Sequence, residues 1–189
     1  MVEYALTVNS LRKSYGDIRA VDDISFEVRR GIIFCLVGPN GTGKTTTMEM
    51  IEGLKAPDSG EIRLLGMPIP EKAKQAKELM GIQLQTTGLF ERLKVGEVVD
   101  LFRSFYRRPL PAKQLLSAVG LESKEGQLVS RLSGGQQQRR AVALALVNDP
   151  EILFLDELTV GLDPQARREA WRLIRSFKER GKTVFFTTH

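Results

Sequence analysis

The chain has 189 residues, enough for one domain with a buried core, and its apolar (42%) and charged (27%) fractions are those of an ordinary globular protein. Its single cysteine excludes an internal disulfide and fits a reducing compartment such as the cytoplasm. No apolar run approaches the roughly 20 residues of a membrane helix, and the first residues resemble no signal peptide, so we expect any membrane association to be peripheral, through another polypeptide.

The net charge of +5 indicates an anionic partner. The basic residues are dispersed as short pairs, whereas a nucleic-acid groove would more often gather them beside aromatic residues. We therefore attribute the charge to solvated helix faces and to attraction for a polyphosphate ligand, and expect no nucleic-acid partner.

The first elements read as strands. Residues 5–8 and 24–28 alternate between apolar and polar side chains, as half-exposed strands do, and they flank a turn at residues 15–17. The apolar run 32–37 predicts a buried strand, in which Cys35 is expected to be a small core residue.

A glycine-rich segment follows that strand and precedes a helix that begins at about residue 46. Glycines let the backbone wrap inward, so that N–H groups and the positive end of the helix dipole converge on phosphate oxygens. Lys44 supplies a charge for the outer phosphates, and the Thr45 hydroxyl can ligate Mg²⁺. A turn that binds nothing is the alternative, but the strand before and the helix after it favour a nucleotide site. The residues expected to bind are Gly38, Pro39, Asn40, Gly41, Thr42, Gly43, Lys44, Thr45 and Thr46.

The middle of the chain changes from strands to helices. Residues 60–66 predict a strand closed by glycine and proline, residues 71–79 a short charged helix, and residues 80–84 a further strand. From residue 95 to residue 147 the apolar spacing is helical, with breaks at Pro109 and Pro111. We expect a helical subdomain at about residues 86–149, inserted into an α/β core made of residues 1–85 and 150–189.

The sheet then resumes. Residues 152–155 form an apolar run, residues 164–180 an amphipathic helix with proline in its first turn and a glycine after it, and residues 183–187 a last strand. Alternating apolar strands and helices predict an α/β fold with a mostly parallel, covered sheet.

Two acids, Asp156 and Glu157, directly follow the apolar run. At the carboxyl end of a strand beside a phosphate loop, Asp156 can hold the Mg²⁺ shell, and Glu157 can orient the attacking water or accept its proton. An acid after four apolar residues is by itself usually a surface carboxylate. Together with the phosphate loop, the pattern predicts a nucleoside triphosphatase.

Residues 132–136 read Leu-Ser-Gly-Gly-Gln and form a second potential anion site, because a hydroxyl and two glycines precede a helix. An ordinary helix capped by Ser133 is an equal alternative on spacing alone. One chain cannot easily bring both sites to one nucleotide if they lie on separate subdomains, whereas two chains arranged head to tail could.

With these segments in this order, nearly the whole chain resembles the nucleotide-binding domain of an ATP-binding cassette (ABC) transporter. The glycine-rich segment is similar to the Walker A motif of that family, residues 152–157 to Walker B, and residues 132–136 to the signature. Four further positions match the family pattern. Gln85 resembles the Q-loop glutamine, and residues 161–163 are similar to the D-loop. His189 lies where the family has its switch histidine, and Tyr15 lies where it has the aromatic residue that stacks on adenine.

The resemblance implies a P-loop NTPase with a mostly parallel core sheet, an N-terminal antiparallel β subdomain and an inserted α-helical subdomain. It also implies ATP and Mg²⁺ as cofactors, with Thr45 and Gln85 as metal ligands and Asp156 organising the metal shell. Glu157 would polarise the attacking water, and His189 would contact the γ-phosphate.

The resemblance further implies a dimer of two ABC domains, identical or different. Residues Ser133, Gly134, Gly135 and Gln136 would act on the ATP of the partner, and Asp163 would contribute across the same interface. A coupling helix of a polytopic membrane subunit would dock at residues 85–90 and the helix that follows them. The implied function is the ATP-hydrolysing subunit of a membrane transporter at the cytoplasmic face of the cell membrane, and residues 85–90 resemble those of bacterial multidrug or antibiotic exporters.

Three of these positions have ordinary alternatives. Tyr15 could be a packed aromatic at a strand end, Gln85 and its neighbour Gln83 could face solvent, and His189 could belong to a frayed tail. Two other functions stay open as well. A soluble ABC ATPase that acts on DNA or the ribosome usually carries a coiled-coil insertion, zinc cysteines or two cassettes, and a small-molecule kinase gives no reason for the Leu-Ser-Gly-Gly-Gln segment.

Two departures from the family pattern stand out. Leu158 replaces the usual proline, which restores a backbone N–H and frees φ, so we expect a less rigid D-loop. Family members also continue beyond the position of His189. We therefore expect a C-terminally incomplete domain, in which the strand at residues 184–186 lacks cover and activity is impaired unless the missing part is supplied.

Overall fold

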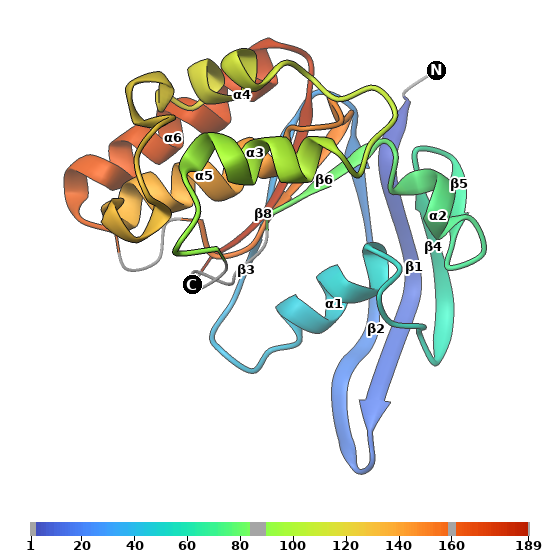
Figure 1. Cartoon of the computed structure of the whole chain (residues 1–189). Coiled ribbons are helices and arrows are strands. Elements are labelled where there is room, and N and C mark those ends of the chain that lie inside the picture. Colours follow the sequence, from blue (N-terminus) through green and yellow to red (C-terminus); the bar gives the residue numbers. More distant parts are fainter. Residues whose placement is uncertain (1–2, 84–89, 159–161, 189) are drawn as a thin grey trace.

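Figure 1 shows the computed structural model, which describes residues 3–83, 90–158 and 162–188. An antiparallel sheet lies on one side of the molecule, a parallel sheet runs through the middle, and most of the helices cover the far face of the parallel sheet. The predicted order of strands and helices is thus largely present.

The antiparallel sheet has the strand order β2-β1-β4-β5. Strands β1 (Tyr4–Tyr15) and β2 (Ile18–Arg29) form one long hairpin, longer than the alternating segments had predicted. Strand β4 (Ser59–Leu64) pairs with β1, and the short β5 (Met67–Ile69) pairs with β4. The sequence did not predict β5, because it contains Pro68. A proline is tolerated there since β5 lies at the edge of the sheet.

The second sheet is parallel, as predicted, and has the order β3-β8-β7-β6. Its strands are β3 (Ile33–Val37), β8 (Thr183–Thr188), β7 (Ile152–Leu155) and β6 (Met80–Ile82). Because all four strands run in one direction, their carboxyl ends meet at one edge of the sheet. The segments that follow β3, β6, β7 and β8 along the chain therefore start from the same side of the molecule.

The helices divide between the two faces of the parallel sheet (Figure 1). Helix α1 (Lys44–Ile51) lies between the two sheets, with its buried residues in one apolar cluster with residues of both. The other face carries α3 (Val95–Arg103), α4 (Ala112–Ala118), α5 (Gly134–Ala145) and α6 (Pro164–Glu179). Helix α2 (Ala73–Ala76) is shorter than the predicted 71–79, and two 3₁₀ turns, η1 (Glu122–Lys124) and η2 (Val129–Arg131), precede α5. Within the described ranges, no helix is both long enough and apolar enough to cross a bilayer.

Side chains of β7 and β8 alternate between the two apolar clusters. Leu153 and Phe186 belong to the cluster under α3–α6, whereas Phe154 and Phe185 belong to the cluster that contains α1. Both strands are therefore buried on both faces, which explains why their sequences are continuous apolar runs instead of alternating ones.

The expected lack of cover over residues 184–186 is wrong. All three side chains are buried: Trp171 of α6 meets Phe186 edge-on with ring centroids 5.2 Å apart, and Phe185 stacks on Phe34 at the same distance. Strand β3 is instead the more exposed one, since it lies at the edge of the sheet, and Val37 at its end is 65% exposed. Cys35 of β3 is accordingly half-buried and not the core residue that the sequence predicted, and partial burial raises the pKa of its thiol.

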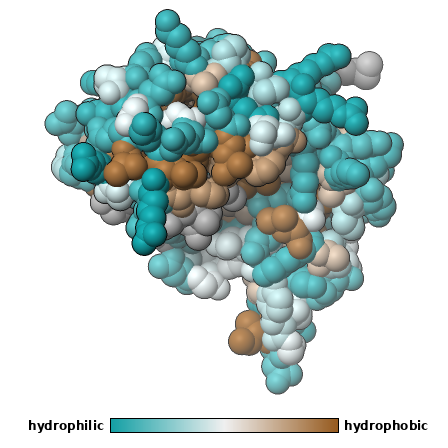
Figure 2. Space-filling view, in the orientation of Figure 1, coloured by the Kyte–Doolittle hydropathy of each residue, from teal (hydrophilic) through white to brown (hydrophobic). Residues whose placement is uncertain are grey.

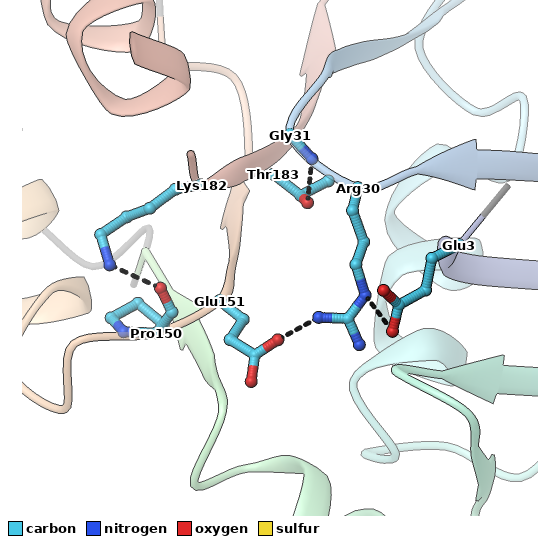
Figure 3. Close-up of polar contacts among 7 residues, drawn as sticks. All are labelled: Glu3, Arg30, Gly31, Pro150, Glu151, Lys182 and Thr183. Carbon is cyan, nitrogen blue, oxygen red and sulfur yellow. Dashed lines mark hydrogen bonds and ion pairs between the residues drawn. The ribbon is translucent and has the colours of Figure 1, made fainter. Parts of the chain in front are cut away.

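Polar contacts join the two sheets at the amino ends of the parallel strands (Figure 3). Arg30, which follows β2, lies between two carboxylates: its Nε is 3.1 Å from Oε1 of Glu3, and its guanidinium also contacts Glu151. Beside it, the backbone N–H of Gly31 donates to Oγ1 of Thr183 at 3.0 Å. This end of the sheet is therefore held by polar contacts that lie opposite the carboxyl edge.

We predict that Phe185→Ala lowers the free energy of unfolding by about 3–5 kcal/mol, because the ring is fully buried between Phe34 and Phe154. Urea unfolding measures the loss. Phe105→Ala is the control: its ring is 68% exposed, and an exposed substitution usually changes stability by less than about 0.5 kcal/mol. Equal losses in the two variants would contradict the placement of Phe185 at the centre of the core.

Candidate functional site

The glycine-rich segment connects β3 to α1 and is closely fitted against β2. Gly43 has a left-handed φ of 83°, and a Cβ at this position would lie 2.0 Å from the carbonyl oxygen of Ala20. Only glycine fits at such a distance from another backbone. The start of α1 is therefore fixed in place by the hairpin of the antiparallel sheet.

Lys44 is buried inside this loop. Its Nζ donates hydrogen bonds to the carbonyl oxygens of Gly38 at 2.5 Å and of Pro39 at 2.8 Å, and Oγ1 of Thr42 donates to the same Pro39 oxygen at 2.8 Å. A buried ammonium group must be hydrogen-bonded, and here the carbonyl groups of the loop satisfy that need. The loop thus carries a positive charge at its centre, where the N-terminal end of α1 adds N–H groups that no helical carbonyl satisfies.

The two acids lie at the carboxyl edge of the same sheet. Asp156, at the end of β7, is 8% exposed, and its Oδ1 accepts a hydrogen bond from the hydroxyl of Thr187 in the adjacent β8. On the other side of β8, Thr188 accepts a weak hydrogen bond at 3.4 Å from the N–H of Gly38. The end of β8 therefore separates the acids from the start of the phosphate loop by one strand.

Glu157 has an unusual backbone. Its φ is +51°, a left-handed conformation that few non-glycine residues adopt, and its N–H donates to Oγ1 of Thr187 at 3.1 Å. Nε2 of Gln138 in α5 lies 3.5 Å from its carbonyl oxygen. Leu158 is buried in the apolar cluster of α5 and α6. This leucine therefore holds the residue after Glu157 in the core.

Ser133 and Gln136 cap the N-terminus of α5 reciprocally. Oγ of Ser133 accepts from the N–H of Gln136 at 3.3 Å, and Oε1 of Gln136 accepts from the N–H of Ser133 at 3.0 Å. The capping prediction is therefore confirmed. It does not exclude the anion site, since a serine hydroxyl that accepts one hydrogen bond can still donate its proton.

The N-terminus of α6 lies beside that of α5. Asp163 caps α6 by accepting from the N–H groups of Gln165 at 2.8 Å and Ala166 at 2.9 Å. Ser133 through Gln136 line, together with Asp163 and Gln165, an open hollow of about 400 Å³. In its wall, the side chains of Arg139 and Glu169 form an ion pair at 3.6 Å that connects the two helices.

Tyr15 ends β1 with an exposed ring. The ring is 44% exposed, and the ammonium groups of Lys13 and Lys55 lie 5.8 Å and 5.3 Å from its centre. Lys55 is also paired with Glu49 of α1 at 2.8 Å. The ring is thus not buried in a core, and lysine contacts connect it to the helix that starts at the phosphate loop.

Sequence reasoning missed several buried polar residues, two of which are Glu52 and Gln83. Glu52, just after α1, is 5% exposed, and burial raises its pKa to about 7, helped by the negative charges of Asp156 and Glu49. Gln83, for which a solvent-facing position was one alternative, is buried after β6, and its Oε1 has no hydrogen-bond partner among the described residues. A signal for Glu52 was present in the sequence: it stands four residues after Met48 and therefore on the same buried helix face.

Several predicted positions lie outside the described residues: Gln85, His189, the first residue of segment 161–163, and residues 86–89 of the predicted docking segment. The other predicted site residues fall into two groups. The phosphate loop and the acids meet at the carboxyl edge of the parallel sheet, whereas Ser133, Gly135 and Asp163 line a separate hollow between α5 and α6.

Residues 21–160 match the family model described as ABC transporter. The chain is 45% identical over 196 residues to the Nod factor export ATP-binding protein I of Paraburkholderia xenovorans, which covers 100% of this chain and 64% of that relative. It is 43% identical over 190 residues to the protein of the same name from Rhizobium meliloti, and this match covers 98% of this chain and 57% of that relative. The chain thus spans less than two thirds of the length of these curated relatives.

Solved structures show the same fold. The ATP-binding cassette MJ0796, in a dimeric post-hydrolysis state bound to ADP and Pi, superposes with a TM-score of 0.84 at 28% identity, covering 97% of this chain and 88% of that one. CbiO1 of Clostridium perfringens, part of the transporter complex cbiONQ, superposes with a TM-score of 0.86 at 30% identity, covering 99% of this chain and 79% of that one. The cassette MJ1267 superposes with a TM-score of 0.87 at 23% identity, covering 98% of this chain and 81% of that one. The predicted fold, a P-loop NTPase with an antiparallel β sheet and inserted helices, is confirmed.

The burial of Glu52 predicts a pH dependence of stability. Its pKa rises from an ordinary 4.5 to about 7 on folding, so the folded state binds this proton more tightly than the unfolded state. The stability that the proton provides is fully present below pH 4.5 and is lost as the pH rises to 7. Between pH 5 and pH 8, the wild-type free energy of unfolding should fall by about 2–3 kcal/mol more than that of Glu52→Gln.

Urea unfolding of both proteins at the two pH values measures this difference, since all other titrating groups are common to them and cancel. Parallel pH profiles for wild type and Glu52→Gln would show that Glu52 is ionised in the folded protein.

Proposed function

The chain belongs to the ABC transporter family of ATP-binding cassettes, and we propose that it is the ATP-binding and ATP-hydrolysing subunit of an ABC membrane transporter. In this function, ATP-driven dimerisation and hydrolysis drive transport by a separate membrane subunit. The observation that carries the proposal is the placement of Lys44, in its phosphate loop, and of the buried Asp156 at the same edge of the parallel sheet.

ATP and Mg²⁺ are the proposed ligands. The N–H groups of the loop and the Lys44 ammonium would bind the β- and γ-phosphates. The Thr45 hydroxyl, which is exposed in the first turn of α1, and the Asp156 carboxylate are hard oxygen donors of the kind that Mg²⁺ prefers, with Gln85 as a further ligand. When bound, Mg²⁺ supplies positive charge to the phosphate oxygens. The exposed ring of Tyr15 would stack on adenine.

Glu157 is the proposed general base. Its backbone is held by Thr187 and Gln138, and it follows β7, which ends at the same edge of the sheet as β3 and the phosphate loop, one strand away. There it can orient a water molecule toward the γ-phosphate and accept its proton. His189, two residues after Thr187, would contact the same phosphate.

A second ABC domain would complete the site. The hollow at Ser133, Gly134, Gly135, Gln136 and Asp163 offers N–H groups from the N-terminus of α5, since Asp163 already accepts those of α6, but it is separate from the phosphate loop. An anion in that hollow would therefore come from another protomer. The dimeric MJ0796 cassette, bound to ADP and Pi, supports this arrangement by similarity.

A polytopic membrane subunit is the proposed partner beside the inserted helices, in a subdomain of about residues 86–149. Figure 2 shows apolar side chains gathered on this part of the surface, and Phe105 is 68% exposed. The rings of Phe90, Phe102 and Phe105 form an edge-to-face series with centroid distances of 6.1 Å and 5.7 Å. The names of the curated relatives, which describe export, support an exporter. Its proposed place is the cytoplasmic face of the cell membrane, where it would meet that subunit.

Two variants separate nucleotide binding from hydrolysis. Lys44→Ala should weaken ATP affinity roughly 10- to 100-fold, because a charged hydrogen-bond donor is lost. Glu157→Gln should keep that affinity, accumulate as an ATP-bound dimer, and lower turnover by about 10²- to 10⁴-fold, because the amide accepts no proton. Equilibrium ATP binding, size-exclusion chromatography and phosphate release measure the three effects. Normal hydrolysis by Glu157→Gln would remove Glu157 from the role of base.

The action of Ser133 on a partner nucleotide can be tested without losing the helix cap. Asp and Asn both cap helices about as well as Ser, but Asp adds a negative charge to the proposed anion site. Ser133→Asp should therefore lower ATP turnover by more than about tenfold relative to Ser133→Asn, while ATP affinity of the single protomer stays unchanged. Wild-type turnover should rise with the square of protein concentration at low concentration. Equal turnover in the two variants, or full activity of lone protomers, would contradict the two-protomer site.

A further inference from the structure

The end of β8 carries a buried hydroxyl that the proposed function does not use. Thr187 is 0% exposed, and its Oγ1 takes part in two hydrogen bonds. It accepts one from the N–H of Glu157 at 3.1 Å, and it donates one to Oδ1 of Asp156. A single oxygen therefore contacts both of the acids that follow β7.

The direction of these bonds follows from the chemistry of the groups. A backbone N–H can only donate, so Oγ1 of Thr187 must be the acceptor toward Glu157. The single hydroxyl proton is then available for Asp156, whose ionised carboxylate can only accept. The two hydrogen bonds, from the N–H of Glu157 to the hydroxyl of Thr187 and from that hydroxyl to the carboxylate of Asp156, thus run in one direction. A hydrogen bond to a charged acceptor is one of the stronger hydrogen bonds in proteins.

The position of Thr187 in the sheet places its contact with Asp156 on the face that carries the phosphate loop. Phe185, two residues earlier in the strand, and Phe154, two residues before Asp156, both face the cluster that contains α1. Because side chains alternate along a strand, Thr187 and Asp156 face the same side as α1 and its phosphate loop. Thr187 is also in register with Leu36 of β3, the strand that leads into that loop.

We propose that Thr187 is a positioning residue for ATP hydrolysis, an inference that rests on the proposed function. Its hydroxyl fixes the orientation of the Asp156 carboxylate toward the metal-binding side. It also helps to hold the backbone of Glu157 at its φ of +51°, which determines where the side chain of the base begins. Thr187 itself touches neither ATP nor Mg²⁺.

The same strand provides a matched control. Thr183 begins β8, is also buried, and faces the same side of the sheet, and its hydroxyl likewise accepts a backbone N–H, that of Gly31, at 3.0 Å. It lies at the opposite end of the strand, among the contacts of Figure 3. Thr→Val at either position removes one hydroxyl, keeps the branched shape and takes the acceptor from a backbone N–H, and only Thr187→Val also removes a donor to a carboxylate.

The test compares Thr187→Val, Thr187→Ser and Thr183→Val with the wild type. Urea unfolding gives stability, Mn²⁺ electron paramagnetic resonance in the presence of ADP gives metal affinity, and phosphate release at varied Mg²⁺ gives kcat and the Mg²⁺ requirement. We expect Thr187→Val alone to weaken Mn²⁺ binding and to lower turnover, each by roughly 10- to 100-fold, the usual effect of removing a partner of a metal-binding carboxylate. ATP affinity without metal should stay at the wild-type value, and Thr187→Ser should restore both properties.

If Thr187→Val binds Mn²⁺ and hydrolyses ATP as Thr183→Val does, Thr187 serves stability alone and the inference is wrong. If instead the wild type releases no phosphate, the proposed function fails, while the Mn²⁺ affinities still decide the role of Thr187. Should Thr187→Val not fold, Thr187→Cys takes its place. The thiol of the cysteine is a weak donor of similar size. A Mn²⁺ affinity of Thr187→Cys that is lower than that of Thr187→Ser, but higher than the affinity expected for Thr187→Val, supports the inference. A wild-type Mn²⁺ affinity of Thr187→Cys overturns it.

Discussion

The site depends on the burial of β8 between β3 and β7. Hydrogen bonds along both sides of β8 fix the register of its neighbours, so that the phosphate loop after β3 and the acids after β7 start from the same edge. This register requires side chains that pack on both faces, which Val184, Phe185 and Phe186 supply. A polar or small residue at any of these three positions would weaken the packing that aligns the phosphate loop with the acids, although none of the three side chains has a reactive group.

Three titratable residues near α1, Lys44, Asp156 and Glu52, are buried, and each is accommodated differently. The Lys44 ammonium is hydrogen-bonded to the carbonyl groups of its own loop. Asp156 receives the hydroxyl proton of Thr187 from the neighbouring strand. Burial, helped by the negative charge of Asp156, raises the pKa of Glu52 to about 7, so the neutral form is accessible near pH 7. The region under α1 thus holds one buried cation and two carboxyl groups without a cluster of surface ion pairs, which would be screened by salt.

Features that depend on neighbouring residues could be predicted from the sequence. The turn at Gly43, the serine cap of α5 and the proline at the start of α6 each result from local backbone chemistry, and the apolar run before Asp156 could become only a buried strand. Features that depend on partners far along the chain could not. The exposure of β3, with the half-burial of Cys35, follows from its place at the sheet edge, and strand order is not written in any one segment. The roles of the signature, the Q-loop and the switch histidine came from family resemblance and remain predictions.

Thr187 shows why such residues escape sequence reasoning. In the sequence it is one of two threonines at the end of an apolar strand, where threonine is common because it fits a pleated, half-buried surface. Its neighbour Thr188 has the same local preference but points to the other face of the sheet. Only the parallel pairing of β8 with β7 places the hydroxyl of Thr187 against a carboxylate that is 31 residues away. The contribution of a residue to this site is therefore set by the face on which it lies and by the strand beside it, so that two identical adjacent residues have different environments.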